Sequence, residues 1–564
     1  MKLTGAQILV HMIKSQGVDT IFGYPGGATI DIHDEVERHD DLRHILVRHE
    51  QGAVHMADAY ARAHKTTGVA LVTSGPGATN TVTGIASAHS DSIPMVVFTG
   101  QVPTGLIGND AFQEVDIVGI TRPCTKHNYL IKDPKKLAST IQEAFHIAQS
   151  GRPGPVLVDL PKDIIQAEIE FDMPEPPQMR SYKPNYKPNK KQMSKAVELI
   201  KSAKRPVFFC GGGVISAQAS ETFTKIAKLA NAPVTGTLMG LGAFPGTDPL
   251  WLGMLGMHGT YRANMSIGNC DLLFSAGVRF DDRVTGRLEN FAPNAKIVQI
   301  DIDPTSIHKN VEVHCPIVGD CRMALDQILK LMKKEDPNGF RSKDRDEWLG
   351  QIDEWKRTTP LKYEQGDDTI KPQYVVEKLH EVTEGKAIVT TEVGQNQMWT
   401  AQYYHFDKPN HFITSGGLGV MGFGLPAAVG AKAAQPDKLV VCVAGDGSIQ
   451  MNSQELMTAV ASKLDVKIVI LNNRYLGMVR QWQELFYDKF YAATNMEAAP
   501  DFVKLADAYG AKGFRCDDPG KVVDTLREGL NTEGTVIMEF VVEREESVYP
   551  MVPAGGALTE MLLV

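Results

Sequence analysis

Two apolar runs near the C-terminus, residues 439–444 and 466–471, are each followed at once by small polar residues. Gly445-Asp446-Gly447-Ser448 follows the first run, and Asn472-Asn473 closes the second. Runs of this length that are almost entirely apolar, here with Lys467 as the one exception, are typical of strands buried on both faces of a parallel sheet. Between them, Asn452-Ser453-Gln454-Glu455 resembles a capping box and predicts a helix that continues through Lys463. The pattern therefore predicts a compact βαβ unit.

The turns of this unit carry candidate ligands. Asp446 and Asn473 would stand at the carboxyl ends of neighbouring strands, where open α/β sheets bind ligands, and the glycines would let backbone N–H groups approach phosphate oxygens. Mg²⁺ prefers oxygen ligands of this kind together with phosphate. A Gly-Asp-Gly sequence alone more often marks an ordinary strand-to-helix turn. It is the pair of turns at this spacing that indicates a diphosphate and divalent-metal site.

Composition narrows the class of protein. A chain of 564 residues suggests about three domains, and a net charge of −9 argues against a nucleic-acid surface. No run of about twenty apolar residues occurs, and the first residues lack the apolar core of a signal peptide, so we expect a cytoplasmic protein without a membrane span. The seven cysteines are scattered without a CxxC pair, which favours buried free thiols over disulfides or structural zinc.

Two stretches rich in proline and charge, 173–191 and 333–372, divide the chain. We expect them to separate three α/β domains, each built on a doubly wound parallel sheet. The expected boundaries are 1–172, 190–335 and 370–545, with a tail over 546–564.

Other motifs are ambiguous when taken alone. Glu50 stands where a strand ends and a helical pattern over 51–63 begins, and a carboxylate there is commonly no more than a charge that stabilises a helix N-terminus. In the middle domain one strand enters Gly211-Gly212-Gly213 and another ends near Asp301, as in nucleotide-binding sheets. The GxGxxG spacing is absent, so these glycines alone indicate a dinucleotide only weakly.

The two C-terminal turns, one crossover apart, resemble the thiamine diphosphate fold of the pyruvate decarboxylase and acetolactate synthase superfamily. The resemblance implies that Asp446, Asn473 and the main-chain oxygen of Tyr475 hold Mg²⁺ against the diphosphate. It makes the first domain pyrimidine-binding, the middle domain FAD-binding and the third diphosphate-binding. The residues implied to contact thiamine diphosphate are Glu50, Pro76, Asn80, Val393, Gly394, Gln395, Asn396, Gly419, Met421, Gly445, Asp446, Gly447, Ser448, Asn473, Tyr475, Leu476, Gly477 and Met478.

Glu50 matches the family glutamate at ring nitrogen N1′, through which the aminopyrimidine removes the cofactor's own C2 proton. The segment 74–80 resembles the loop that lines the pyrimidine, and in relatives this loop faces the Gly-Asp-Gly unit of another subunit. The resemblance therefore implies at least a dimer.

The glycine-rich segment 416–426 has no phosphate-loop spacing, and a flexible turn is the simplest interpretation. In the family, Met421 matches the apolar wedge that bends the cofactor, and the Gly419 carbonyl matches the acceptor for its amino group. A core methionine is the alternative for Met421. Glu392 and Asn396 stand where the family usually has Asp and His, so a phosphate contact from Asn396 is less secure.

Two segments of the middle domain, 253–259 and 277–286, resemble those that hold FAD in biosynthetic acetohydroxyacid synthases. A solvated charge cluster is the alternative for Arg279 to Arg283, but the flanking apolar strands and glycines favour contacts with a pyrophosphate and a carboxylate. The residues implied to contact FAD are Gly211, Gly212, Gly213, Thr237, Leu238, Met257, His258, Gly277, Arg279, Asp281, Arg283, Val284, Asp301, Ile302 and Asp320.

Further stretches of the chain, 100–103 with 109–114, 159–163 and 477–482, resemble active-site positions of the same family. Trp482 would stand over the second substrate and favour an ethyl over a methyl side chain, by ~1–3 kcal/mol. A packing stripe with Met478 is the alternative. The implied catalytic residues are Glu50, Gln113 and Lys162, and the implied substrate residues are Gly26, Phe112, Arg283, Met478, Val479 and Trp482.

Resemblance to the catalytic subunit of biosynthetic acetohydroxyacid (acetolactate) synthases runs from Ile21 to Pro553 and so covers essentially the whole chain. It implies that pyruvate is decarboxylated and joined to a second 2-oxo acid, pyruvate or 2-oxobutyrate. The products would be 2-acetolactate or 2-aceto-2-hydroxybutyrate, in the first common step of branched-chain amino acid biosynthesis. A homodimer or dimer of dimers with active sites between subunits, and a small regulatory subunit, are also implied.

Several alternatives share parts of this pattern. A pyruvate oxidase would have the same thiamine unit, glutamate and FAD, although the Arg279–Arg283 and Met478–Trp482 segments favour ligation. A catabolic acetolactate synthase makes the same product without FAD. Glyoxylate carboligase lacks the glutamate that Glu50 supplies. A flavin-binding assembly protein with an inactive thiamine site is disfavoured because Glu50, Asp446 and Asn473 are all present.

Overall fold

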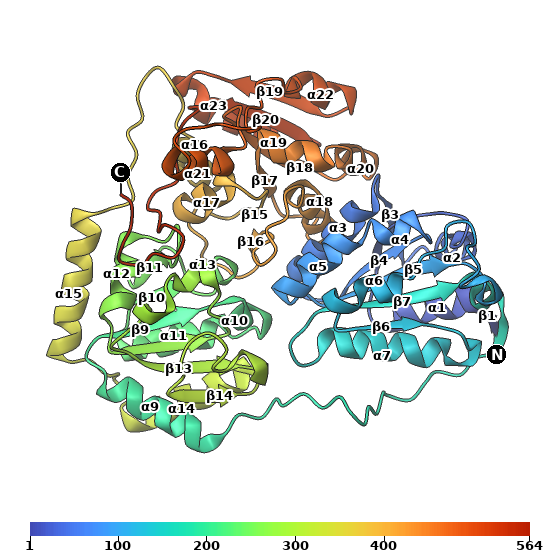
Figure 1. Cartoon of the computed structure of the whole chain (residues 1–564), viewed down its shortest axis with the longest axis horizontal. Helices are drawn as coiled ribbons and strands as arrows, with labels where there is room; N and C mark the ends of the chain where they lie inside the picture. The colour runs from blue at the N-terminus through green and yellow to red at the C-terminus, as the bar shows by residue number, and fades with distance from the viewer. Residues whose placement is uncertain (564) are drawn as a thin grey trace.

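Three six-stranded sheets, one for each expected domain, organise the chain in the computed structural model, which describes residues 1–563 (Figure 1). Every neighbouring pair of strands in these sheets is parallel. Parallel sheets need helical crossovers and are covered by helices on both faces. The predicted α/β class with three doubly wound parallel sheets is confirmed.

The N-terminal sheet has the strand order β3-β2-β4-β5-β7-β6. Alternate residues of its strands enter different cores, because Val69 and Leu71 pack with α1 and α7 whereas Ala70 packs with α3 and α5. The elements are α1 (Gly5–Ser15), β2 (Thr20–Tyr24), β3 (Arg43–Leu46), α3 (Glu50–His64), β4 (Gly68–Val72), α5 (Val82–Asp91), β5 (Met95–Gln101), β6 (His127–Leu130), α7 (Leu137–Gln149) and β7 (Pro155–Pro161).

The C-terminal sheet has the order β16-β15-β17-β18-β20-β19, which repeats the N-terminal topology strand for strand. The sequence indicated only a general likeness between these two domains. Its elements are β15 (Ile388–Thr391), α17 (Gln395–Tyr403), β16 (Phe412–Ile413), α18 (Gly424–Ala434), β17 (Val440–Gly445), α20 (Glu455–Ala461), β18 (Val466–Asn472), α21 (Gly477–Phe486), α22 (Phe502–Ala508), β19 (Lys512–Cys516), α23 (Val522–Asn531) and β20 (Val536–Val541).

The middle sheet differs, with the order β11-β10-β9-β12-β13-β14. In chain order this is 3-2-1-4-5-6, the doubly wound arrangement of dinucleotide-binding sheets. The elements are α9 (Lys190–Ser202), β9 (Pro206–Cys210), α10 (Gly212–Ser216), α11 (Ser220–Ala230), β10 (Val234–Gly236), β11 (Trp251–Met254), α12 (Tyr261–Asn269), β12 (Leu272–Ala276), α13 (Asp282–Thr285), β13 (Lys296–Asp301), β14 (Cys315–Val318), α14 (Cys321–Glu335) and α15 (Lys343–Thr358).

The predicted capping box at Asn452 was wrong. Helix α20 begins only at Glu455, ends at Ala461, and its N-cap residue Gln454 makes no side-chain cap. The reason is tertiary: Asn452 Nδ2 donates to the Gly422 carbonyl, and the Glu455 carboxylate accepts from a backbone N–H of the N-terminal domain. Side chains committed to such distant partners cannot cap their own helix.

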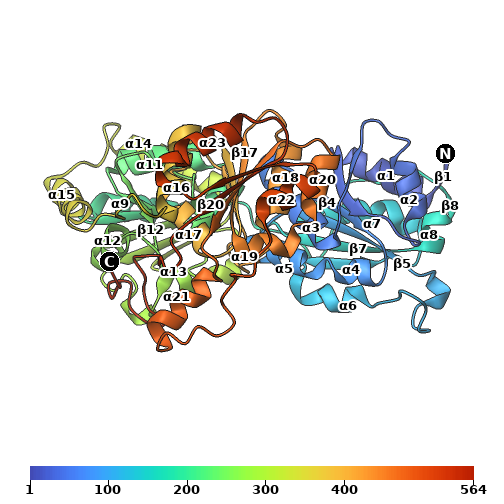
Figure 2. The ribbon, with the colours of Figure 1, turned by 90° about the horizontal axis from the view of Figure 1, so that it is seen from above.

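The N-terminal and C-terminal domains pack directly on each other through α3 and α18, as two perpendicular views show (Figures 1 and 2). Both helices are buried almost all round, and they share one hydrophobic cluster. Residues 173–189 contain no helix or strand and run from the N-terminal to the middle domain.

All seven cysteines are free, and six of them are buried, as predicted. Among the helices of residues 1–563, none has the length and apolar character needed to cross a bilayer.

Candidate active site

The carboxyl ends of β15, β17 and β18 open into one cavity. In the strand order of this sheet β15 and β17 are neighbours whose crossovers leave in different directions, and such switch points are where open α/β sheets bind ligands. The residues that line the cavity are Val393, Gly394, Gln395, Asn396, Trp399, Met421, Gly445, Asp446, Gly447, Ser448, Leu471, Asn473, Tyr475, Leu476, Gly477, Met478 and Val479. The cavity thus gathers the predicted cofactor residues of the C-terminal domain, apart from Gly419.

Asp446 is the most unusual side chain in this cavity. It is only 1% exposed, yet neither carboxylate oxygen has a hydrogen-bond partner among the described residues. Burial raises its pKa to about 7, although the nearby N–H groups of Asn473 and Gly447 oppose the rise without reaching hydrogen-bond geometry. A buried carboxylate without partners is costly unless a cation balances its charge. The residue therefore fits the ligand of a divalent metal ion.

Asn473 lies beside it in a fixed orientation. Its Oδ1 accepts from the Tyr475 N–H at 3.1 Å, and its Nδ2 donates to Gln395 Oε1 at 3.1 Å. The turn after β18 thus brings Asn473 and the backbone of Tyr475 to the same edge of the sheet as Asp446. No group of three or more His, Cys, Asp or Glu side chains suited to a metal ion occurs in residues 1–563. A magnesium ion here would draw on amide, carbonyl and phosphate oxygens besides one carboxylate, as Mg²⁺ commonly does.

Glu392 and Asn396, which stand where the family usually has Asp and His, both have structural roles. The Glu392 carboxylate is fully buried and accepts from the N–H groups of Gly422 at 2.6 Å and Leu425 at 3.1 Å. Asn396 Nδ2 donates to the carbonyls of Glu392 and Val443, at 3.1 and 3.0 Å. Both amide hydrogens of Asn396 are therefore occupied, and a phosphate contact would require one of these bonds to break.

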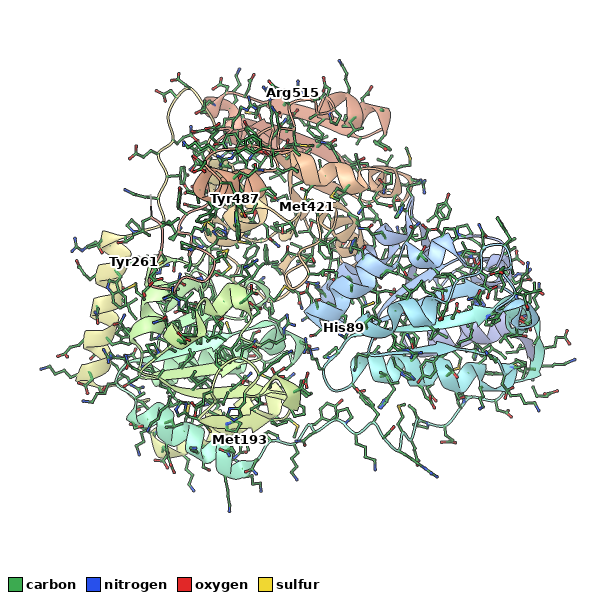
Figure 3. The ribbon with its side chains drawn as sticks, in the orientation of Figure 1. His89, Met193, Tyr261, Met421, Tyr487 and Arg515 are labelled. Atoms are coloured by element: carbon green, nitrogen blue, oxygen red, sulfur yellow. The ribbon has the colours of Figure 1, made fainter. Side chains whose placement is uncertain are left out.

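The segment that carries Gly419 and Met421 reaches this cavity through Met421. Met421, labelled in Figure 3, is one of the residues that line the cavity, and Gly419 adopts φ +74° close to the Val393 side chain. A positive φ of this size favours glycine. Gly419 and Met421 therefore lie on one tightly turned segment of backbone, hereafter the strip. It carries the carbonyl of Gly419 and the side chain of Met421.

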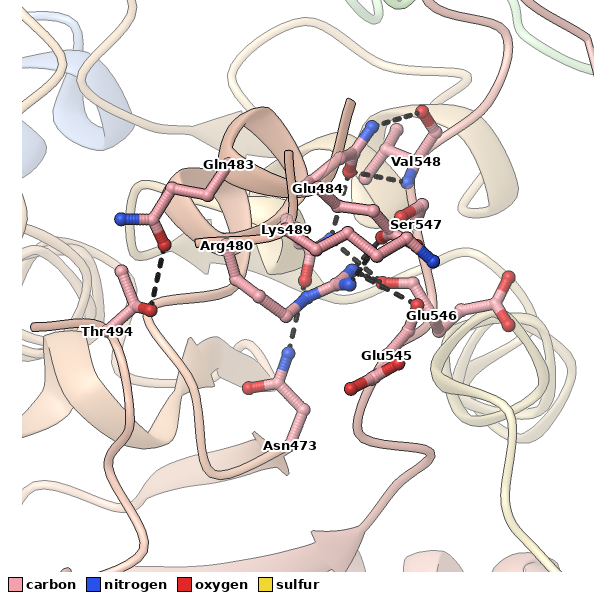
Figure 4. A network of polar contacts seen from close by, with 12 residues as sticks. Asn473, Arg480, Gln483, Glu484, Lys489, Thr494, Glu545, Glu546, Ser547 and Val548 are labelled. Atoms are coloured by element: carbon pink, nitrogen blue, oxygen red, sulfur yellow. Dashed lines mark hydrogen bonds and ion pairs between the residues drawn. The ribbon is translucent and has the colours of Figure 1, made fainter. Parts of the chain in front are cut away.

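Helix α21, which carries Met478, Val479 and Trp482, is held by the C-terminal tail (Figure 4). Arg480 is fully buried and donates through Nη2 to the carbonyls of Glu545 and Glu546, both at 3.0 Å. Gln481 exchanges two hydrogen bonds with Val548. The sequence analysis includes Arg480 and Gln481 in the segment 477–482 but gives neither a role. Their only further signal is that they are polar residues on the buried side of an amphipathic helix.

Trp399 and Leu471 also line the cavity without having been predicted. Trp399 is 2% exposed, and its indole N–H has no partner among the described residues. A buried indole N–H normally finds an acceptor, so this donor is an unsatisfied polar group in a residue that lines the cavity.

A second group of predicted residues gathers at the carboxyl edge of the N-terminal sheet. Asn80 Nδ2 donates to Glu50 Oε2 at 2.9 Å, and Lys162 Nζ donates to the Gly27 carbonyl at 3.0 Å. The backbone of Gln113 packs on Gly75, next to Pro76, while Phe112 is 88% exposed. Neither Glu50, Pro76 nor Asn80 lines the cavity of the C-terminal domain. The structure thus gives two separate groups within one chain.

The predicted FAD residues lie mainly at the switch point of the middle sheet. Gly211 and Gly277 follow the adjacent strands β9 and β12, and their backbones touch. Asp301 ends β13, and burial raises its pKa to about 6. Arg279 pairs with no carboxylate in the described part of the chain, whereas exposed Arg283 pairs with Asp282 at 3.1 Å. An unpaired guanidinium beside a dinucleotide-type switch point fits an anionic nucleotide.

The other predicted FAD residues surround this edge. Met257 and His258 lie under the C-terminal tail, where His258 Nδ1 contacts the Pro550 carbonyl at 3.3 Å. Burial lowers the pKa of His258 to about 4, so the ring is neutral at physiological pH. Asp320 caps α14 through the N–H of Met323. The remaining members stand in or beside the turns at this edge: Gly212, Gly213, Thr237, Leu238, Asp281, Val284 and Ile302.

Three family models match successive parts of the chain. They are the N-terminal TPP binding domain of thiamine pyrophosphate enzymes over residues 3–120, their central domain over 193–328, and their C-terminal TPP binding domain over 392–540. Thiamine pyrophosphate is another name for thiamine diphosphate. These matches confirm the predicted superfamily and support a thiamine diphosphate site.

Full-length relatives narrow this to one family. The chain is 50% identical over 566 residues to the acetolactate synthase isozyme 3 large subunit of Escherichia coli, and 49% identical to the acetolactate synthase large subunit of Haemophilus influenzae; each match covers 100% of this chain and 98% of the relative. It is 45% identical to a probable acetolactate synthase large subunit of Methanococcus aeolicus, over 99% of this chain and 95% of the relative. The predicted resemblance is confirmed, and the chain belongs to the acetolactate synthase large-subunit family of thiamine pyrophosphate enzymes.

Proposed function

We propose that this protein is the catalytic subunit of an acetolactate synthase, which decarboxylates pyruvate and joins the remaining two-carbon unit to a second 2-oxo acid. The acceptor would be pyruvate or 2-oxobutyrate. The observation that carries the proposal is Asp446, a buried carboxylate without a hydrogen-bond partner in residues 1–563, inside a cavity lined by the diphosphate-side residues of the family. Full-length relatives named acetolactate synthase large subunit support it.

Thiamine diphosphate, when bound, supplies the nucleophilic carbon and takes up the electron pair that decarboxylation releases. Asp446, Asn473 and the Tyr475 carbonyl would hold Mg²⁺, and with it the diphosphate, at the edge of the C-terminal sheet. The Met421 side chain would support the cofactor from below, and the Gly419 carbonyl would accept a hydrogen bond from its amino group. Glu50 would hold a proton at the pyrimidine ring nitrogen, the role that needs a carboxylate rather than an amide.

A second copy of the chain is needed to complete this site. Glu50, Pro76 and Asn80 do not line the cavity formed by their own chain's C-terminal domain. In a homodimer or dimer of dimers, these residues of one subunit would meet the cavity of its partner. A small regulatory subunit is part of the same proposal, because the relatives are named large subunits.

Substrate and FAD would occupy the space around this cofactor. Arg283 would pair with the acceptor carboxylate, and Phe112, Met478, Val479 and Trp482 would form an apolar wall, with Gly26, Gln113 and Lys162 at the edge of the N-terminal sheet. FAD would bind at the switch point of the middle sheet. Because the carboligation has no net redox change, the flavin would not turn over.

Anaerobic product analysis tests the proposal. The protein is incubated with pyruvate, thiamine diphosphate, Mg²⁺ and FAD while flavin absorbance is followed. Acetolactate with the flavin still oxidised is the expected result. Acetate or acetyl phosphate with stoichiometric flavin bleaching would instead identify an oxidase, and full activity in a flavin-free preparation would remove FAD from the proposal.

A further inference from the structure

Two buried carboxylates cross the interface between the N-terminal and C-terminal domains, in opposite directions. The first is Glu455, a fully buried residue at the start of α20. Both of its oxygens lie 3.2 Å from the N–H of Arg48, two residues before Glu50. A side chain of the C-terminal domain thus holds the backbone at the point where β3 passes into α3.

Gly52 shows how closely this contact is fitted. A Cβ atom at Gly52 would lie 2.6 Å from Glu455 Oε1, nearer than side-chain atoms normally approach. The helix α3 therefore has a glycine in its first turn, where alanine would be the better helix former. The glycine makes room for the carboxylate.

The second carboxylate is Asp91, at the end of α5, whose side chain is likewise inaccessible to solvent. It reaches from the N-terminal domain into the C-terminal domain. Asp91 Oδ2 accepts from the Gly416 N–H at 3.0 Å, and Oδ1 accepts from the Gly417 N–H at 2.7 Å. These residues stand immediately before the strip that carries Gly419 and Met421.

Arg62, at the other end of α3 from Glu50, completes the Asp91 contact. Its Nη2 lies 3.2 Å from Asp91 Oδ2, its Nε lies 2.7 Å from Asp58 Oδ1, and its Nη1 donates to the Thr414 carbonyl at 2.9 Å. Asp91 and Arg62 together fix one acceptor and two donors on the backbone over 414–417.

These contacts act on irregular backbone rather than on regular structure. The rest of the interface is mainly apolar packing of α3 on α18, with hydrogen bonds that involve no carboxylate, such as Ser87 Oγ with Ser415 Oγ at 2.9 Å. This packing would hold the domains together without a buried carboxylate. Burying carboxylates is costly, and stability alone favours apolar replacements. Each carboxylate instead holds a loop that precedes a predicted cofactor contact. Glu392 secures the far end of the strip through Gly422 and Leu425.

We propose that Glu455 and Asp91 are reciprocal positioning residues, each holding the cofactor-contacting backbone of the other domain. Glu455 would fix the position of Glu50, and Asp91 with Arg62 would fix that of Gly419 and Met421. The inference rests on the proposed function, since that function makes Glu50 and the strip parts of a cofactor site.

Hydrogen–deuterium exchange on the full-length protein, without cofactor or substrate, tests the contacts directly. The variants are Glu455→Gln, Asp91→Asn and Gly52→Ala, in which the added methyl group would displace the Glu455 carboxylate without removing it. Asp34→Asn and Glu381→Gln are matched controls, because each removes an exposed carboxylate paired with a basic side chain nearby in the same stretch of chain. We expect exchange to rise roughly tenfold, as for one lost hydrogen bond to a charged acceptor.

The rise should be local. Asp91→Asn should affect peptides over 414–422, and Glu455→Gln and Gly52→Ala should affect peptides over 46–52, with the controls unchanged. Unchanged exchange in all three variants would overturn the proposal. An increase spread over whole domains, with a lower melting temperature, would identify a structural role only and would overturn it too. Should either amide variant fail to fold, Gly52→Ala still decides the Glu455 contact and Arg62→Lys the Asp91 contact.

A second measurement separates the two roles. Asp91→Asn should raise the dissociation constant for thiamine diphosphate roughly tenfold, since it loosens the strip under the cofactor, and Glu455→Gln should lower kcat with little change in that constant. If both variants leave cofactor affinity and kcat at the wild-type values, the positioning role is wrong. A wild-type protein that makes no acetolactate would count against the proposed function alone, because exchange and cofactor binding do not require that product.

Discussion

At the scale of single residues, the chemical role of Glu50 can be tested without disturbing its packing. Its carboxylate accepts from Asn80, which an amide oxygen at the same position can also do. Glu50→Gln should therefore keep fold and cofactor but lower turnover by roughly 10²–10⁴, the usual contribution of proton transfer to a positioned group. Steady-state acetolactate formation and cofactor titration measure this.

Glu170→Gln is the control for this substitution, because the side chain of Glu170 is 81% accessible and Glu170 lies in the same domain as Glu50. It should leave turnover unchanged. Wild-type activity in Glu50→Gln would remove the carboxylate from the mechanism.

Trp482 offers a test of acceptor preference. It is partly buried, and its ring packs on Phe486 with centroids 5.9 Å apart. Trp482→Leu should lower the preference for 2-oxobutyrate over pyruvate by about tenfold, since one methylene in an apolar pocket is worth ~1–3 kcal/mol. The product ratio under competition measures it. Trp355→Leu, in a tryptophan pair of the middle domain, should leave the ratio alone, and equal ratios in both variants would contradict the role.

Asp159 gives a pH-dependent prediction. It is buried, accepts from Thr99 and Gln101, and burial raises its pKa from 3.8 to about 7. The Asp159 carboxyl therefore holds its proton more tightly in the folded state than in the unfolded state. The contribution of this bound proton to the free energy of unfolding is complete below pH 3.8 and is lost as the pH rises to about 7. The difference amounts to roughly 4 kcal/mol at most. The melting temperature of the wild type relative to Asp159→Asn should fall between about pH 4 and pH 7, whereas the melting temperature of the wild type relative to Asp34→Asn should show no such trend.

At the scale of elements, the turn after β18 is packed without spare room. A Cβ atom at Gly477 would overlap Gln395 Oε1 and lie 2.7 Å from Asn473 Nδ2. Gly477→Ala should therefore displace Asn473 and weaken Mg²⁺ and cofactor binding by at least roughly tenfold, the effect of losing one such contact. Calorimetric titration measures this. Gly350→Ala, on α15 with open space around it, is the control, and equal affinities in both variants would show that Asn473 is not a ligand.

Strands and cofactor turns could be predicted from the sequence because their signals are local. The apolar runs 439–444 and 466–471 became β17 and β18 with shifts of one residue. The start of α20 could not be predicted, because Glu455 serves Arg48, about four hundred residues away in the chain. The long-range contacts of Asp91, Glu392 and Arg480 could not be predicted for the same reason, since their partners include distant backbone atoms that no local pattern specifies.

At the scale of the whole molecule, the separation of Glu50 from the Asp446 cavity makes a dimer the smallest complete enzyme. Glu50→Gln and Asp446→Asn variants, each nearly inactive, should regain activity when refolded or coexpressed together. One site of each mixed dimer would then be intact, so random pairing should restore about a quarter of the wild-type activity. No recovery, with mixed dimers shown to form, would mean that both residues serve a site within one chain.

The packing of α3 on α18 also has a consequence for folding during synthesis. The apolar surface of α3 is finished early, but α18 lies some 370 residues later, after the entire middle domain. At typical rates of translation, roughly 20–70 s pass before the ribosome delivers the helix that covers it. During that interval the apolar surface of α3 stays exposed on the nascent N-terminal domain and can aggregate. The yield of folded protein should therefore depend on chaperones until the last third of the chain emerges.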